Sequence, residues 1–254
     1  MNLILLDPHE IGADGVARIE GERARHITTV LKTAPGATIR VGCIGGGRGT
    51  ATVDAVSPRG VDLRCAIEAG GARRPPIDLL LALPRPKVMR RLWAQIAALG
   101  VGQIILTNAE RVERNYFDTH VIAHESYRPL LIEGLQQAAD TYLPTVSIHR
   151  QLKVLVEDHL DALTGEGQRL IAHPGAAETV SDAVCKTAQT TVLLAIGPEG
   201  GWNAFERDLL GRHGFAPVAM GPRTLRSDTA TIALLTLAHD GFARRNSRYS
   251  YPHA

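Results

Sequence analysis

A glycine-rich turn between an apolar run and a helix is the first segment whose residues could do chemistry. Residues 192–206 read VLLAIGPEGGWNAFE, and the apolar run Val192–Ile196 predicts a buried strand. Glycines allow close approach of the backbone to a ligand and leave N–H groups free to donate, and Glu199 could accept hydrogen bonds from a ligand amine or hydroxyl. Asn203 and Glu206 have the spacing of an N-cap and a variant capping box. A plain strand-to-helix turn is the alternative interpretation.

A second segment, residues 220–230, reads MGPRTLRSDTA and follows the short apolar stretch Ala216–Ala219. Arg226 comes just before a predicted helix, where its guanidinium could hold an anionic or carbonyl-bearing substrate. Pairing with a surface carboxylate is the alternative. The following stretch Thr229–Ala238 is apolar on nearly every side, so it must be buried on most of its surface. This pattern indicates a subunit interface, with a central core helix as the alternative.

Two other segments do not support the chemistry that they first suggest. The glycines of 45–49 lack the Gly-Lys-Ser/Thr of a phosphate-binding loop and join two β patterns, which favours a hairpin turn. His120, His124 and Glu125 would need a second histidine at 128 to form a zinc motif, and that residue is Arg128. We therefore expect no metal site.

The absence of G-x-G-x-x-G after a strand argues against a nucleotide-dependent oxidoreductase.

Elements after residue 72 alternate between apolar strand patterns and helical patterns, which predicts a parallel sheet in an α/β domain. Ligands in such sheets bind beyond the carboxyl ends of the strands, where residues 197–201 would lie. The expected strands are Leu79–Leu83, Gln103–Leu106, Leu170–Ala172 and Val192–Ile196.

The first 72 residues have mainly β patterns. Apolar and polar residues alternate over 61–67, and glycine turns separate several short strands, which predicts a small barrel. One helix is expected over Glu22–Lys32. The segment GGARRPP at 70–76 is typical of a linker because its prolines stop a helix or central strand. We therefore expect domains at 1–72 and 73–254.

Composition narrows the class of protein. Hydrophobic residues make up 44% and charged residues 21% of the 254 residues, which argues against global disorder. The net charge of +2 excludes a polycation. Arginine makes up 24 of the 28 basic residues, which suits phosphate contacts but also fits genomic composition bias. We expect a cytoplasmic protein for three reasons. The three cysteines are widely spaced, which fits a reducing compartment. The sequence has no apolar run of about 18 residues and no signal-peptide pattern.

The two C-terminal segments together resemble the SPOUT methyltransferases. More narrowly, they resemble the ribosomal small subunit methyltransferase E family, the 16S rRNA (uracil-N3)-methyltransferases. Its members usually read close to GPEGG and LRxETA, whereas this chain has Asp228 in place of the glutamate. RHITTVLK at 25–32 also resembles the family's His-x-x-x-Val-Leu-Arg segment. The likeness spans essentially the whole chain.

This resemblance implies a SPOUT-type α/β domain with a C-terminal trefoil knot, preceded by a PUA-like β-barrel domain that binds RNA. It also implies a homodimer that acts on 16S rRNA with S-adenosylmethionine as cofactor. Arg226 is the candidate catalytic residue, because its charge could stabilise a developing uracil anion. RNA contacts are expected at Arg25, His26, Arg90 and Arg91, although His26 could be a helix-surface residue without such a role. The expected cofactor-binding residues are Ile196, Gly197, Glu199, Gly200, Gly201, Met220, Gly221, Leu225, Ser227 and Thr229.

Three positions depart from the family pattern. Gln95 and Ala98 stand where members carry lysine and glutamate, and Asp140 stands where an arginine is typical. These positions are expected near the RNA substrate and not in the cofactor loops. They leave two alternatives open: a divergent paralogue that methylates another RNA, and a non-catalytic RNA-binding or assembly factor.

Overall fold

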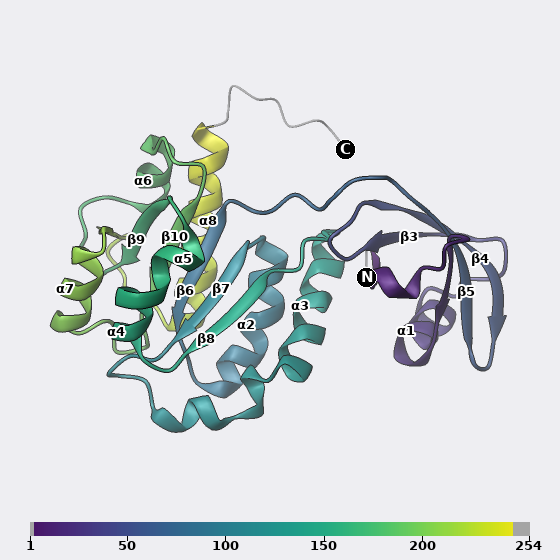
Figure 1. Cartoon of the computed structure of the whole chain (residues 1–254), viewed down its shortest axis with the longest axis horizontal. Helices are drawn as coiled ribbons and strands as arrows, with labels where there is room; N and C mark the ends of the chain where they lie inside the picture. Colours follow the sequence, from purple (N-terminus) through teal and green to yellow (C-terminus); the bar gives the residue numbers. More distant parts are fainter. Residues whose placement is uncertain (1–2, 246–254) are drawn as a thin grey trace. The chain divides into compact units, whose positions relative to one another are not determined.

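The protein is described by a computed structural model that covers residues 3–245. The chain divides into two compact units, Met1–Arg74 with Ile132–Leu143, and Pro75–Leu131 with Pro144–Ala254 (Figure 1). Residues 132–143, which the expected boundaries place in the C-terminal domain, therefore group with the N-terminal unit.

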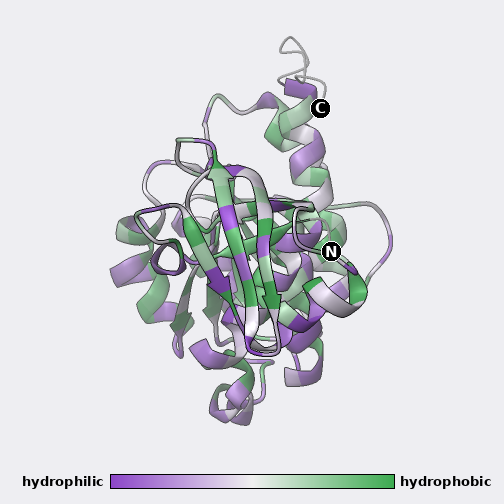
Figure 2. Ribbon diagram, turned by 90° about the vertical axis from the view of Figure 1, so that its right-hand side faces the viewer, coloured by the Kyte–Doolittle hydropathy of each residue, from purple (hydrophilic) through white to green (hydrophobic). Residues whose placement is uncertain are grey.

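The N-terminal unit contains a five-stranded sheet in the order β1-β3-β4-β5-β2. Only β1 and β3 pair in parallel among these strands. The hairpin predicted at 45–49 is confirmed, since it joins the antiparallel strands β3 and β4. Hydrophobic and hydrophilic residues alternate along the strands (Figure 2). The strands are β1 (Ile4–Leu6), β2 (Val16–Ile19), β3 (Thr38–Cys43), β4 (Arg48–Ser57) and β5 (Gly60–Ile67).

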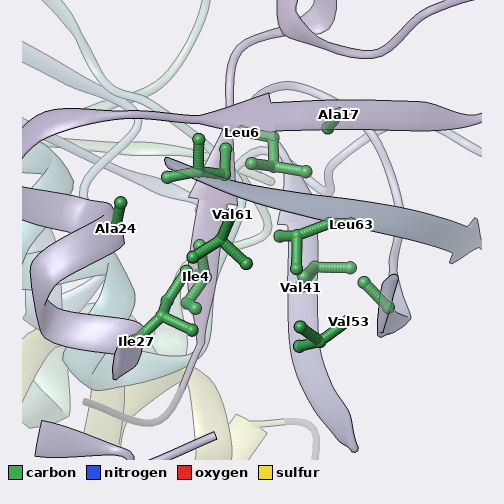
Figure 3. Close-up of a cluster of buried hydrophobic side chains, with 11 residues drawn as sticks. Ile4, Leu6, Ala17, Ala24, Ile27, Val41, Val53, Val61 and Leu63 are labelled. Carbon is green, nitrogen blue, oxygen red and sulfur yellow. The ribbon is translucent and has the colours of Figure 1, made fainter. Parts of the chain in front are cut away.

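A short helix packs on this sheet and closes its hydrophobic core. Ala24 and Ile27 face Val61 and other buried side chains from the strands (Figure 3). The predicted helix is not a single regular α-helix, because α1 (Gly21–Arg25) continues as a π-helical turn over His26–Val30. The hydroxyls of Thr28 and Thr29 donate back to the carbonyls of Ala24 and Arg25, a contact that bends helices.

The C-terminal unit contains a six-stranded sheet in the order β11-β9-β10-β6-β7-β8, in which every neighbouring pair is parallel. The predicted parallel α/β sheet is therefore confirmed. β6 and β10 are buried along their whole length, as expected for central parallel strands. The strands are β6 (Ile77–Ala82), β7 (Gln103–Thr107), β8 (Thr145–His149), β9 (Gln168–Ala172), β10 (Val192–Ile196) and β11 (Phe215–Val218).

Helices cover both faces of this sheet, with α4 and α5 on one face and α8 on the other (Figure 1). The last helix, α8, packs against α6, α2, β6 and β10. Gly241 allows its close contact with α6, because a Cβ there would lie 2.7 Å from the Ser181 carbonyl oxygen. The helices are α2 (Pro86–Leu99), α3 (His124–Ala138), α4 (Leu152–Val154), α5 (Leu160–Thr164), α6 (Val180–Lys186), α7 (Ala204–Arg212) and α8 (Ser227–Arg245).

Candidate cofactor site

A cavity of about 330 Å³ lies in the C-terminal unit, where the loops after three neighbouring strands meet the start of α8. These strands are β9, β10 and β11. Their parallel direction brings the carboxyl ends to one edge of the sheet, which is where such sheets bind ligands. The lining includes Ala172–Pro174, Ile196–Trp202, Val218–Gly221, Arg223–Leu225, Ser227, Leu234, Arg111 and Arg207.

The loop after β10 is a tight turn with little space around its backbone. The Gly201 N–H donates to the Pro198 carbonyl at 2.8 Å, and Gly201 has a φ of +70°, which favours glycine. A Cβ at Gly197 would lie 3.1 Å from the indole ring of Trp202, which is 4% exposed. Local geometry therefore favours glycine at both positions.

The start of α7 holds this loop in place. Asn203 Oδ1 accepts the Glu206 N–H at 2.8 Å, and Glu206 Oε2 accepts the Asn203 N–H at 2.7 Å. The predicted capping box is therefore confirmed. Glu206 is only 5% exposed, and its other carboxylate oxygen, Oε1, accepts the Glu110 N–H at 2.8 Å. This buried carboxylate thus joins α7 to the loop after β7.

The segment that leads into α8 completes the cavity wall. Gly221 has a φ of +132°, a backbone conformation that other residues rarely adopt. Ser227 is buried, and its hydroxyl donates to Glu199 Oε1 at 3.3 Å. The two C-terminal sequence segments are therefore in direct contact.

Nine of the ten residues predicted to bind the cofactor line this cavity: Ile196, Gly197, Glu199, Gly200, Gly201, Met220, Gly221, Leu225 and Ser227. The tenth, Thr229, is exposed on α8 and does not line it. The Thr229 N–H donates to Asp228 Oδ1 at 2.9 Å.

Four residues with basic side chains at the cavity were not predicted: Arg111, His173, Arg207 and Arg223. His173 follows β9, so the rule that ligands bind beyond strand ends could have identified it. Arg207 donates to the Trp202 carbonyl at 3.1 Å. No signal in the sequence connects Arg111, which follows β7, with a loop almost 90 residues away.

Arg226, the candidate catalytic residue, is exposed and does not line the cavity, although its neighbours Leu225 and Ser227 do. Its guanidinium has no partner among residues 3–245. The alternative of an ion pair with a surface carboxylate therefore does not apply to the part of the chain that the structure describes.

The negative charge of Glu199 in the turn affects the pKa of the Tyr116 phenol. Burial and the hydrogen bond to Glu113 raise its pKa, and the charge of Glu199 acts in the same direction, while Arg85 opposes it. A phenol with an ordinary pKa of about 10 is protonated at neutral pH even without this shift. The Tyr116 hydroxyl donates to Glu113 Oε1 at 3.1 Å and is a poor proton acceptor.

Two of the four residues predicted to contact RNA lie in the N-terminal unit and two in the C-terminal unit. In the N-terminal unit, exposed Arg25 pairs with Glu22 at 3.1 Å, and His26 Nε2 is buried without a partner among the described residues. In the C-terminal unit, Arg90 and Arg91 are exposed on α2. Arg91 pairs at 3.2 Å with Asp228, which follows the catalytic candidate Arg226 by two residues.

The three departures from the family pattern have different surroundings. Gln95 is exposed and Ala98 half-buried on α2. Asp140 Oδ1 accepts the N–H groups of Thr141 and Tyr142 at 2.6 and 3.1 Å, within the segment that groups with the N-terminal unit. Asp140 therefore stabilises a local turn.

Within residues 3–245, no group of three or more His, Cys, Asp or Glu side chains is arranged to hold a metal ion. No helix in the same range has the length and apolar character needed to cross a membrane.

Comparisons with known proteins agree on one family. A family profile described as an RNA methyltransferase domain matches residues 72–239. The ribosomal RNA small subunit methyltransferase E of Treponema pallidum is 32% identical over 237 residues, which cover 92% of this chain and 88% of that protein.

Two solved structures share the fold over nearly the whole chain. A Legionella pneumophila protein described as a methyltransferase, solved with bound SAM, has a TM-score of 0.75 and 26% identity, covering 94% of this chain and 96% of that one. The ribosomal RNA small subunit methyltransferase E of Neisseria gonorrhoeae, solved with S-adenosylmethionine, has a TM-score of 0.76 and 20% identity, with coverages of 93% and 95%.

Proposed function

Because the chain belongs to the ribosomal RNA small subunit methyltransferase E family, we propose that it transfers a methyl group from S-adenosylmethionine to N3 of one uridine in 16S rRNA. One observation carries this proposal. The two sequence segments that resemble the family, 196–202 and 220–230, meet at one cavity although they lie apart in the chain.

The lining of the cavity suits S-adenosylmethionine. Leu225 and Leu234 offer apolar contacts, and the glycine turn offers main-chain groups. Glu199 supplies a carboxylate that suits a cationic amine. Trp202, which also lines the cavity, has a buried Nε1 without a partner among the described residues. A ligand acceptor at this nitrogen would remove the cost of leaving it unpaired.

The bound cofactor supplies a methyl group already activated by its sulfonium charge. The protein's main task is then to align the methyl carbon with the uracil nitrogen. Neutral uracil N3 carries a proton and is a poor nucleophile, so its developing negative charge needs a base or a nearby positive charge. Arg226 is the proposed source of that charge, since its guanidinium is unpaired in the described part of the chain.

The proposed architecture includes a trefoil knot, a PUA-like RNA-binding barrel and a cytoplasmic homodimer. The match to the methyltransferase family supports the knot. The mainly antiparallel sheet of the N-terminal unit supports the barrel. Ile232, Ala233 and Leu237 remain only half-buried on α8, which supports a dimer interface there.

The test combines cofactor binding with mapping of the product. Calorimetry of the purified protein with S-adenosylmethionine should show binding. Small ribosomal subunits from cells lacking the protein, incubated with the purified protein and S-adenosylmethionine, should gain one methyl group at N3 of one uridine. Mass mapping of the 16S rRNA identifies the position. Binding without methyl transfer would favour a non-catalytic RNA-binding factor, and no binding would refute the proposal.

Arg226→Ala tests the catalytic assignment separately. Its affinity for S-adenosylmethionine should stay unchanged, because Arg226 does not line the cavity. Turnover should fall about 10²–10³-fold, as when one donor to a developing anion is removed. Full activity of this variant would exclude Arg226 from the mechanism.

A further inference from the structure

Arg111 connects the loop after β7 with the glycine turn of the cavity. Its Nη1 donates a hydrogen bond to the Gly200 carbonyl oxygen. A Cβ at Gly200 would lie 2.8 Å from Arg111 Cδ, so the arginine side chain also packs closely over this glycine. Arg111 thus covers the turn at both its carbonyl and its Cα.

The position of Arg111 is fixed by its two neighbours in the chain. On one side the Glu110 N–H donates to the buried carboxylate of Glu206 at 2.8 Å. On the other side Val112 is 6% exposed, and its N–H donates to the Ala109 carbonyl at 3.0 Å. The backbone therefore holds Arg111 next to the turn, although its side chain is exposed.

We propose that Arg111 is a positioning residue that latches the turn 197–201 in the conformation that binds the cofactor. The latch is the contact of Arg111 with Gly200. This inference rests on the proposed function for the identity of the ligand, and it adds a residue from outside the segments that the family resemblance identified.

Physical reasons favour such a latch at this turn. Gly200 and Gly201 have more backbone freedom than any other residue type, so an unrestrained turn would populate conformations that do not bind. When only a fraction of the protein has the binding conformation, the apparent Kd rises as the inverse of that fraction. A hydrogen bond from a charged donor is stronger than a neutral one, and it restricts the turn before the ligand arrives.

The first experiment measures cofactor affinity after removal of the guanidinium, which takes away both its hydrogen bond and its charge. Arg111→Met keeps a side chain of similar length without a donor, and we expect the Kd for S-adenosylmethionine to rise about three- to tenfold. Arg111→Lys keeps a charged donor and should restore most of the affinity. Arg114→Ala, an exposed arginine that does not line the cavity, is the matched control and should bind as the wild type does.

A double-mutant cycle then separates a latch from direct contact between Arg111 and the ligand. Gly200→Ala places a methyl group where Arg111 Cδ lies, and Gly200 is not in the left-handed region, so alanine fits its backbone. This substitution should raise the Kd by displacing the latch. In the Arg111→Ala background it should have almost no further effect, because the latch is already lost.

The results distinguish the inference from the proposed function. The latch would be overturned if Arg111→Met bound S-adenosylmethionine as tightly as the wild type. It would also be overturned if the effects of Arg111→Ala and Gly200→Ala on the Kd multiplied in the double variant. Both results would leave cofactor binding by the wild-type protein intact. Failure of the wild-type protein to bind S-adenosylmethionine would overturn the proposed function itself. Thermal unfolding of the single variants should remain close to that of the wild type, since the Arg111 side chain is exposed.

Discussion

Glu206→Gln should destabilise the C-terminal unit, because the carboxylate of Glu206 accepts two main-chain hydrogen bonds in a buried position. One oxygen accepts the Asn203 N–H at 2.7 Å and the other accepts the Glu110 N–H at 2.8 Å. Glutamine keeps one acceptor oxygen and places an NH2 group against the second N–H. One of these two main-chain donors therefore loses its partner in a site that water hardly reaches.

The expected size follows from these two contacts. Hydrogen bonds to charged groups contribute about 1.5–3 kcal/mol, and the loss includes the cost of a donor left unpaired. This range already contains the cost of weakening the helix cap, which alone is about 1 kcal/mol. We expect the free energy of unfolding to fall by about 2–3 kcal/mol, which for a unit of this size lowers the Tm by about 4–12 °C.

Urea and thermal unfolding of the full chain, followed by circular dichroism, would measure this change. Asp208→Asn is the matched control in the same helix, because Asp208 is 70% exposed and pairs only with Arg212 at 3.2 Å among the described residues. The control should change stability by less than about 0.5 kcal/mol. Wild-type stability of Glu206→Gln would show that the buried carboxylate does not hold the two loops.

Three further predictions concern other parts of the molecule. Gly197→Ala should cost about 1–3 kcal/mol by overpacking, and weaken cofactor binding measured by calorimetry, since its Cβ would lie 3.1 Å from a buried indole. Burial alone would raise the pKa of Glu10, but the hydrogen bond and charge of Arg23 lower it below its ordinary value. The N-terminal unit should therefore lose stability as the pH falls through this depressed pKa, and Glu10→Gln should remove that part of the pH dependence in acid titrations. Leu237→Lys should shift sedimentation from dimer to monomer if α8 forms the interface, whereas Val154→Lys on α4 should not.

The features that the sequence predicted best depend on neighbouring residues. Asn203 and Glu206 are three positions apart, and their capping box forms as the spacing requires. β10 spans the predicted range Val192–Ile196, because an unbroken apolar run between turns fits a central parallel strand. In both cases the determining contacts are either local or follow from burial alone.

Features that depend on distant partners were not predictable from the same patterns. Segment 132–143 groups with the N-terminal unit. Its Thr141 hydroxyl donates to the Gly46 carbonyl at 2.7 Å, and the Gly45 N–H donates to the Thr141 carbonyl at 2.8 Å. These bonds join residues about 95 positions apart. Periodicity assigns an element to a strand or helix but does not identify its partner.

Strand order explains why the site combines predictable and unpredictable residues. The three loops that line the cavity follow β9, β10 and β11, which are adjacent in the sheet, so each loop could be recognised from its own strand. Arg111 follows β7, and β6 separates β7 from β10. It reaches Gly200 because Glu206, from the helix after β10, binds the Glu110 N–H and draws the loop after β7 toward the turn. A residue that caps a helix locally therefore also determines a long-range contact at the cavity.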